Sequence, residues 1–384
     1  MRRLVVLLLI ALVLATTTWP PGRAAASTLL LLPELFPNAP ARPLEWVTPA
    51  PTRATVTLRF DGRTSAASLY EPATPGPHGG VVIFLGVAPA GLDDPRVVSL
   101  GNGLARIGLV TLIPRSQDLV DSKVDATEID HIIAAFEYLA ARPEVDPTRI
   151  GIGGFCIGAG LALVAAEDPR INQQVALVNS FTGYYDLSSY AISILTRSIE
   201  PYPPEPGISR VAWEPAPNAT AVLADHLISL DPSPAERDLL RAAVRDPKAP
   251  RPVPEKLTPI GRTIWSALTT RDPSTAQTLL DDLPPADRDL LRRLSASSDI
   301  ANLHARVFIM HDRDDNTVPY VQSRLLAAHL KPGQGEYDEF HFFKHVDPTA
   351  AVSPLVFVQD AARLAWHMFQ IVEILQGAVP VERF

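Results

Sequence analysis

This chain of 384 residues contains a single cysteine, Cys156. One cysteine excludes an internal disulfide framework and any metal site built from several thiolates. The formal net charge is −8, so the chain also lacks the basic excess that a dedicated nucleic-acid binder needs. What it does have is 47% hydrophobic residues and 38 prolines, about twice the usual share. It can therefore bury a sizeable core, with prolines confined to loops, linkers and helix starts.

The first 26 residues have the pattern of a secretory signal peptide. Arg2 and Arg3 precede an apolar run over residues 4–15, and three alanines at 24–26 supply the small residues of a cleavage site. The run is shorter than the roughly 20 residues of a bilayer span. An uncleaved segment that also buried residues 16–19 would instead tether the protein to a membrane. We expect export to the periplasm or outside of the cell, with cleavage favoured over an N-terminal anchor.

The rest of the chain divides into segments of different patterning. Residues 27–53 are rich in Pro and Leu without clean periodicity. The next stretch alternates short apolar runs with helical patterns, which indicates a mostly parallel central sheet with helices on both faces. Strand signals then vanish, Pro-started helices take over, and the sheet pattern later resumes. We predict a leader or linker, a first part of an α/β core, a helical cap insertion and a second part of the core, at 27–53, 54–186, 187–300 and 301–384.

The strongest local motif is Gly154-Phe155-Cys156-Ile157-Gly158, between a predicted strand and a predicted helix. It is the thiol version of the G-x-S-x-G nucleophile elbow. The turn must be so sharp that side chains at Gly154 and Gly158 would collide with the neighbouring strand and helix. The N–H of Ile157 is then at a helix N-terminus, which favours an oxyanion and a thiolate. Two other interpretations are an inert buried thiol and a dinucleotide loop, because Gly151-x-Gly153-x-x-Cys156 nearly spells G-x-G-x-x-G.

An acidic loop follows the predicted strand at 305–310. A carboxylate in this position suits the acid of a triad, which accepts a hydrogen bond from an imidazole and fixes its orientation. We choose Asp315, because the Val-Pro pair three residues later returns the chain to a helix. Asp312 and Asp314 are rivals, and a solvated acidic loop is the alternative.

A histidine base is expected just past the last predicted strand, Tyr337 to Phe343. His345 is at the end of this strand, whereas His341 lies within the aromatic run and is expected to pack. The two histidines also have the i,i+4 spacing of metal ligands. A Phe-rich stretch favours a strand over a helix and no third ligand is fixed by spacing, so no metal is predicted.

The order Cys156, Asp315, His345 matches the nucleophile–acid–base order of an α/β-hydrolase. On these motifs the chain resembles the α/β-hydrolase superfamily, most nearly the dienelactone hydrolase family, over about 54–186 and 301–376. The resemblance implies an α/β-hydrolase fold, hydrolysis of lactones or esters by a Cys-His-Asp triad, and no cofactor. The oxyanion loop of that family corresponds to residues 85–90, which lack the acidic residue and the His-Gly of the family. By position, the N–H of Val87 is the second oxyanion donor beside Ile157.

We therefore expect an exported hydrolase that cleaves a small-molecule carboxylic ester, lactone or thioester through a covalent acyl-enzyme. Its cap would exclude water and select substrate. Tyr184 and Tyr185, just before the insertion, are candidates for lining the pocket, although tyrosines in such a position more often brace a loop. The alternatives are an acyltransferase or thiol peptidase on the same fold, and a non-catalytic binding module with a decayed site.

Overall fold

The computed structural model describes residues 18–36, 39–87, 91–246 and 248–384. Its centre is an eight-stranded sheet in the order β1-β2-β4-β3-β5-β6-β9-β10. β1, β2 and β4 pair antiparallel, and every pair from β4 to β10 is parallel. The strands are β1 (Thr52–Phe60), β2 (Arg63–Glu71), β3 (His78–Phe84), β4 (Leu109–Pro114), β5 (Val145–Phe155), β6 (Val175–Phe181), β9 (Arg306–Asp312) and β10 (Gly335–Phe340).

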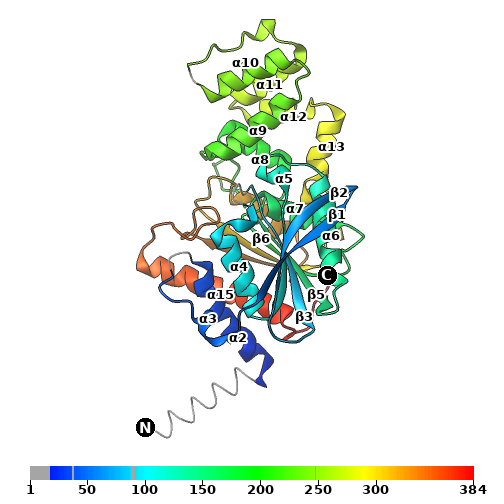
Figure 1. The fold of residues 1–384 in the computed structure, drawn as a ribbon. Helices are drawn as coiled ribbons and strands as arrows, with labels where there is room; N and C mark the ends of the chain where they lie inside the picture. The colour runs from blue at the N-terminus through cyan, green and yellow to red at the C-terminus, as the bar shows by residue number, and fades with distance from the viewer. Residues whose placement is uncertain (1–17, 37–38, 88–90, 247) are drawn as a thin grey trace.

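Helices cover both faces of this sheet, as runs of strands that are apolar on both faces require (Figure 1). One apolar layer joins β-strand residues to α6 (Thr127–Ala140), α7 (Ile157–Glu167) and α14 (Val321–His329). The other joins them to α2 (Pro20–Leu31), α4 (Pro95–Arg106) and α15 (Pro354–Leu375). The predicted fold class, a mostly parallel sheet flanked by helices, is confirmed.

The N-terminal part of the described chain is integrated into the second layer. α2 packs against α15, and the 3-10 helix η1 (Leu32–Leu35) and α3 (Pro43–Val47) follow it. Ala24 is fully buried in this layer. The expected cleavage point after residue 26 therefore lies inside α2, while residues 1–17 of the expected signal segment lie outside the described residues. Within the part that is described, no helix combines the length and apolarity needed to cross a membrane.

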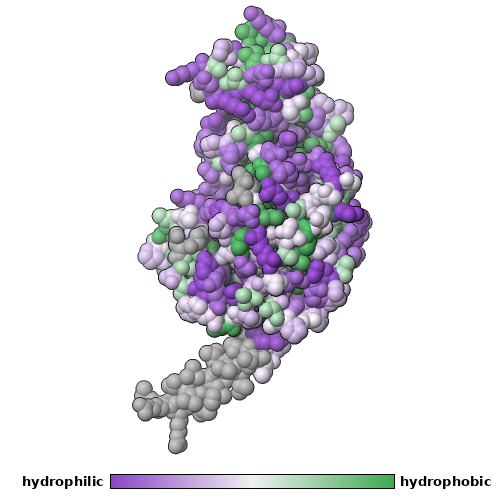
Figure 2. Space-filling model, in the orientation of Figure 1, coloured by the Kyte–Doolittle hydropathy of each residue, from purple (hydrophilic) through white to green (hydrophobic). Residues whose placement is uncertain are grey.

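The segment between β6 and β9 is mainly helical and extends beyond the carboxyl edge of the sheet (Figure 1). Several of its helices start with proline, whose missing N–H is not needed in a first turn. Hydrophilic side chains predominate on the face shown in Figure 2, over both this segment and the core. Its elements are α8 (Leu187–Thr196), β7 (Ser198–Ile199), β8 (Val211–Ala212), α9 (Pro217–Ser229), α10 (Pro234–Arg245), α11 (Pro259–Thr269), α12 (Pro273–Asp281) and α13 (Pro285–Arg293).

The last strand ends earlier than its sequence pattern predicts. The apolar run suggests a strand to Phe343, but β10 stops at Phe340. Beyond this point two backbone amides donate to side-chain carboxylates and not to the neighbouring strand. Asp360 Oδ2 accepts from His341 N at 2.7 Å, and Asp312 Oδ2 accepts from Phe343 N at 2.9 Å. The chain therefore leaves the sheet and becomes a loop before residue 345 is reached.

Glu167, at the end of α7, is a buried acid outside the predicted site. Its side chain is 4% exposed, and its Oε1 has no hydrogen-bond partner among the described residues. Burial, with a smaller contribution from the charge of Asp299, raises the pKa of Glu167 to about 9. The carboxyl is therefore protonated at neutral pH in the folded protein.

Replacing Glu167 by glutamine is expected to stabilise the protein at alkaline pH and not at acidic pH. The unfolded chain releases this proton above about pH 4.3, whereas the folded chain keeps it until about pH 9. The free energy of unfolding of the wild type therefore decreases as the pH rises through this window, by on the order of a few kcal/mol. The glutamine amide does not titrate, so this decrease is absent in the variant. Urea unfolding at pH 4.5 and pH 8 measures it, with Glu137→Gln on the exposed side of α6 as control. Equal gains at both pH values would contradict the buried-acid explanation.

Candidate active site

Cys156 occupies a tight turn between β5 and α7 with a backbone conformation that side chains rarely adopt. Its φ is 56° and its ψ is −129°. Such strain is tolerated where the surrounding structure fixes it, often at functional sites. A Cβ on Gly154 would lie 2.4 Å from Ala159 Cα, and one on Gly158 would lie 2.5 Å from Phe84 O. Both glycines are therefore required by backbone contacts, for the reason given by the sequence motif.

Replacing Gly158 by alanine is expected to destabilise the protein by about 3 kcal/mol or more, because the new methyl group meets two carbonyls of the β3 exit that cannot rotate away. Thermal unfolding of purified protein measures the loss. Gly76→Ala is the matched control, since a Cβ there meets only the ring of His78, whose one hydrogen bond, to Thr74 O, is exposed and can be replaced by water. A melting temperature of Gly158→Ala equal to that of the control would contradict the tight-turn explanation.

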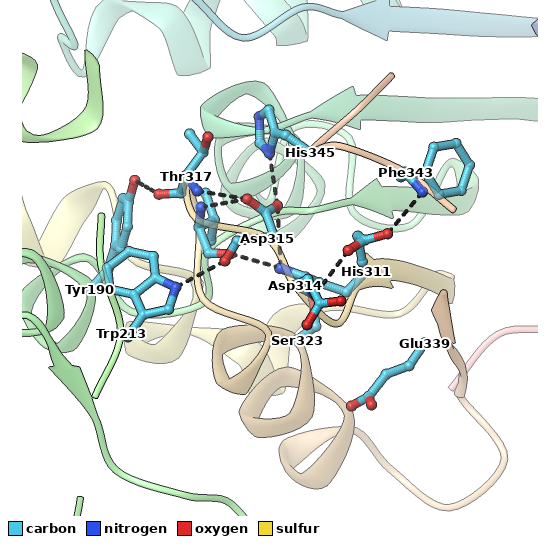
Figure 3. A network of polar contacts seen from close by, with 12 residues as sticks. Tyr190, Trp213, His311, Asp314, Asp315, Thr317, Ser323, Glu339, Phe343 and His345 are labelled. Atoms are coloured by element: carbon cyan, nitrogen blue, oxygen red, sulfur yellow. Dashed lines mark hydrogen bonds and ion pairs between the residues drawn. The ribbon is translucent and has the colours of Figure 1, made fainter. Parts of the chain in front are cut away.

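Asp315 lies in the loop after β9, in a ring of hydrogen bonds (Figure 3). Its Oδ1 accepts from the amides of Thr317 at 2.7 Å and Val318 at 3.2 Å. Its Oδ2 lies 2.7 Å from His345 Nδ1, the distance of a strong hydrogen bond, and 3.6 Å from His311 Nε2. The side chain is fully buried, so the imidazole contact is shielded from water.

The two rival aspartates are placed differently. Asp312 Oδ1 accepts from the amide of Asp314 at 2.9 Å, and its Oδ2 accepts from Phe343 N. Burial raises the pKa of Asp312 to about 7. Asp314 is exposed to solvent. Of the three acids, Asp315 is the one with a carboxylate oxygen on His345.

His345 faces both Asp315 and Cys156. Burial lowers its pKa, but the charge of Cys156, the hydrogen bond to Asp315 and a hydrogen bond with Cys156 together raise that pKa well above the usual value. Because Nδ1 faces Asp315, Nε2 is the nitrogen left for the sulfur. His341, by contrast, does not pack as expected: its side chain is 45% exposed and its Nδ1 is 3.6 Å from Asp360 Oδ2. The early end of β10 turns this ring away from the aromatic layer.

The loop that carries His345 is held by a tight turn and an ion pair. His345 has a φ of 58°, a second strained position beside Cys156. Lys344 N donates to Asp347 O at 2.6 Å, and Asp347 forms an ion pair with Arg96 at the start of α4. Arg96 is itself held by Asp94, with Nη2 2.6 Å from Oδ2. The imidazole is therefore fixed from the loop side as well as by Asp315.

Ile157 and Val87 line the same cavity as Cys156. Ile157 is the first residue of α7, and the amides of a first helical turn have no intrahelical acceptor. Gly86 precedes Val87, and a Cβ there would lie 2.8 Å from Cys156 Cβ. The loop can therefore approach the cysteine closely with its backbone, as an oxyanion hole requires.

A cavity of about 1430 Å³ opens onto Cys156 and His345. Tyr184 and Tyr185 are not among the described residues that line it, so the structure agrees with the second of the two roles considered for them, bracing. The Tyr184 hydroxyl donates to Leu294 O at 2.8 Å, and the Tyr185 ring stacks on His329. Tyr184 therefore braces the insertion against the core, whereas Tyr185 packs on α14 of the core.

Two aromatic residues that sequence reasoning missed support the Asp315 loop (Figure 3). Tyr190, which lines the cavity, donates to Thr317 O at 2.6 Å. Trp213 Nε1 donates to Asp315 O at 2.9 Å. Both residues come from the insertion, where no spacing relates them to the acid loop. Across the described ranges, no group of three His, Cys, Asp or Glu side chains is placed to hold a metal ion.

Comparison with known proteins gives matches over the first part of the core. The family model of the dienelactone hydrolase family matches residues 66–192, a stretch that contains the cysteine turn. The predicted resemblance to this family is confirmed.

Two curated mouse proteins match a similar share of the chain. Acyl-coenzyme A thioesterase 2, mitochondrial, of Mus musculus is 27% identical over 147 residues, which is 36% of this chain and 32% of the relative. Acyl-coenzyme A thioesterase 1 of the same organism is 27% identical over 147 residues, covering 36% and 34%. The match therefore spans about a third of the length of these relatives.

Solved structures match over most of the chain at low identity. A puromycin-hydrolyzing peptidase of Mycobacterium tuberculosis has a TM-score of 0.50 and 14% identity, covering 88% of this chain and 41% of that one. A 2,6-dihydroxy-pseudo-oxynicotine hydrolase has a TM-score of 0.49 and 13% identity, covering 87% and 71%. At its identity of 14%, the match to the peptidase bears on the fold alone, which is that of the α/β-hydrolases.

Proposed function

We propose that this α/β-hydrolase chain cleaves a carboxylic ester, lactone or thioester, with Cys156 as nucleophile, His345 as acid and base, and Asp315 as the orienting acid. The observation that carries the proposal is His345, whose Nδ1 is 2.7 Å from the buried Asp315 carboxylate and whose pKa is raised by Cys156 and Asp315 despite burial. An inert buried thiol would not be paired with an imidazole in this way.

In the proposed reaction the Cys156 sulfur forms a bond to the carbonyl carbon, with its proton held by His345. The amides of Ile157 and Val87 stabilise the negative oxygen. Protonated His345 then gives its proton to the leaving group as the carbon–heteroatom bond breaks, which leaves a thioester on Cys156. Water, deprotonated by His345, attacks this thioester, and the acid product leaves as Cys156 is restored.

A cysteine nucleophile favours substrates with good leaving groups. The tetrahedral adduct formed by Cys156 can expel either the cysteine sulfur or the alkoxide of the substrate. The sulfur leaves more readily unless His345 protonates the alkoxide. A thioester expels a thiolate of comparable stability, and thiols of lower pKa leave faster. This chemistry agrees with the thioesterase names of the curated relatives, and it makes activated esters and thioesters the first substrates to test.

Export is a separate part of the proposal, supported by Arg2, Arg3 and the apolar run that follows them. An exported enzyme would meet esters outside the cytosol more often than coenzyme A thioesters. The helices from α8 to α13 act in this proposal as a cap that selects substrate, since residues of α8, α9, α10 and α13 line the cavity.

The proposal predicts a covalent acyl group on Cys156. Rapid mixing with a p-nitrophenyl ester, acid quenching and mass spectrometry should give a mass increase of one acyl group on the peptide that contains this residue. Adding hydroxylamine before quenching should remove it, because thioesters are cleaved by this reagent. If the ester is turned over with neither a pre-steady-state burst nor an acylated peptide in the mass spectrum, covalent catalysis is contradicted. Competing alcohols or amines in the assay distinguish an acyltransferase or peptidase.

A further inference from the structure

The cavity at Cys156 has two arms of different chemistry. One, the sheet arm, runs from the cysteine along the face of the sheet that α4 and α15 cover. The lining residues from the strands, from α15 and at Leu104 of α4 are apolar except for one asparagine, and are Val81, Ile83, Leu104, Leu109, Leu177, Asn179, Phe181, Met310, Leu364, Met368, Ile371, Val372 and Leu375. Polar groups also line the cavity on the α4 side, from Glu34, Arg42, Arg96 and Ser99.

Two glycines of the central strand let side chains of the neighbouring strands lie across it beside this arm. Gly151 and Gly153 of β5 alternate with Ile152, so their missing side chains belong to one face of the strand. Gly153 lines the cavity and pairs with Ile83 on β3 and Asn179 on β6. The side chains of neighbouring strands fill the space over both glycines: a Cβ on Gly153 would lie 2.8 Å from Ile83 Cδ1, and one on Gly151 would lie 2.9 Å from Leu177 Cδ1. Ile83 and Leu177 therefore form the surface of the arm over this part of the sheet.

Helix α15 forms the opposite wall. Leu364, Met368, Ile371, Val372 and Leu375 share one face of the helix, at the spacings of four, three, one and three residues that follow a helical stripe. Eleven residues of helix span about 16 Å. An extended chain advances about 3.5 Å for three bonds, so this length accommodates about 13 bonds.

The other arm, the cap arm, is lined by residues of the insertion and carries charge. Arg245 lies 2.9 Å and Arg241 lies 3.5 Å from the carboxylate oxygens of Asp225, and His226, the next residue after Asp225, also lines the cavity. A polar leaving group would be solvated in the cap arm, whereas it would have few hydrogen-bond partners in the sheet arm. The two arms therefore match the two sides of an acyl bond.

We propose that the substrate is an ester or thioester of a long unbranched acyl chain, which lies in the sheet arm while the leaving group lies in the cap arm. This inference rests on the proposed function, since the chain would be attached to the carbonyl that Cys156 attacks. The wall that α15 forms is long enough for about 12 carbon atoms of such a chain. Each methylene that enters it should raise kcat/KM about threefold until the arm is filled.

The test is kcat/KM for p-nitrophenyl acetate, octanoate, dodecanoate and hexadecanoate with the full chain. We expect dodecanoate to exceed acetate by at least about 100-fold, with little further gain for hexadecanoate. Ile371→Trp, which places an indole in the arm, should lower the dodecanoate-to-acetate ratio at least 20-fold. Ile374→Trp is the matched control: Ile374 is buried in the same layer of α15 but is not among the residues that line the cavity. It should leave the ratio within twofold.

A second measurement covers the case in which Ile371→Trp does not fold. Dodecanoate added to the Cys156→Ala protein should raise its melting temperature, and acetate should not. Equal turnover of acetate and dodecanoate, or a ratio that both tryptophan variants change alike, would overturn the inference. If these turnovers nevertheless depend on Cys156, the proposed function stands and only the acyl-chain assignment fails. If they do not depend on Cys156, the proposed function itself fails.

Discussion

Replacing Cys156 by alanine is expected to lower kcat/KM for ester or thioester substrates by at least about 10⁴-fold, because the atom that forms the bond to the carbonyl carbon is removed. Losing a triad member abolishes nearly all chemistry while the oxyanion donors and the binding cavity persist. Steady-state assays of purified wild type and variant, with the same p-nitrophenyl and acyl-thioester substrates, measure the ratio.

The variant must also be shown to fold. Alanine at this position removes only the sulfur of a half-buried side chain, so the melting temperature should stay close to that of wild type. Cys156→Ser is a useful second variant, because it keeps an oxygen nucleophile in the same turn and should recover a small part of the activity. Wild-type rates in a folded Cys156→Ala protein would refute the assignment of Cys156.

Asp315→Asn is expected to lower kcat by about 10³- to 10⁴-fold. The carboxylate raises the pKa of His345 through its hydrogen bond and its charge. Its removal should therefore lower that pKa, so the protonated imidazole is lost at lower pH. The alkaline limb of the pH–rate profile should move to lower pH, an effect that a merely structural role would not produce.

Asp314→Asn is the matched control for this experiment. Asp314 is in the same loop and carries the same charge, but its side chain is exposed. We expect kcat within about twofold of wild type and an unmoved pH profile. If both variants lost activity equally, or if Asp315→Asn kept an unshifted profile, Asp315 would not be the orienting acid.

The sequence allowed much of the core to be predicted because its signals are local. Cys156 sits in a glycine-bounded turn, and Asp315 and His345 each follow an apolar run. Parallel strands bring their carboxyl ends to one edge. The structure indeed joins Asp315 to His345 across 30 residues of chain. Strand ends were less predictable, since β10 is cut short by carboxylates from residues 312 and 360.

What could not be predicted depends on contacts between distant segments. Tyr190 and Trp213 reach the acid loop from the insertion, and no periodicity in either segment encodes that contact. Tyr184 was a candidate for the pocket because of its position in sequence. Its hydroxyl instead donates a hydrogen bond to the carbonyl of Leu294, 110 residues away. The sheet arm is similar: the apolar stripe of α15 is visible in the sequence, but the space it leaves over the sheet is a property of packing.

If the chain is cleaved after residue 26, as the sequence predicts, the position of α2 would couple this cleavage to folding. The helix runs through the expected cleavage point, with Ala24 on one side and Leu31 on the other, both buried in the layer that α15 covers. A chain cut before it folds would lose residues 20–26 of this 12-residue helix, and the layer would pack around the remaining residues. A chain that folds first would hold the same peptide bond inside a packed helix. A peptidase needs its substrate as an extended strand, so the bond would be protected from cleavage. If the first 26 residues are removed, the timing of that removal relative to folding would decide which of the two forms accumulates.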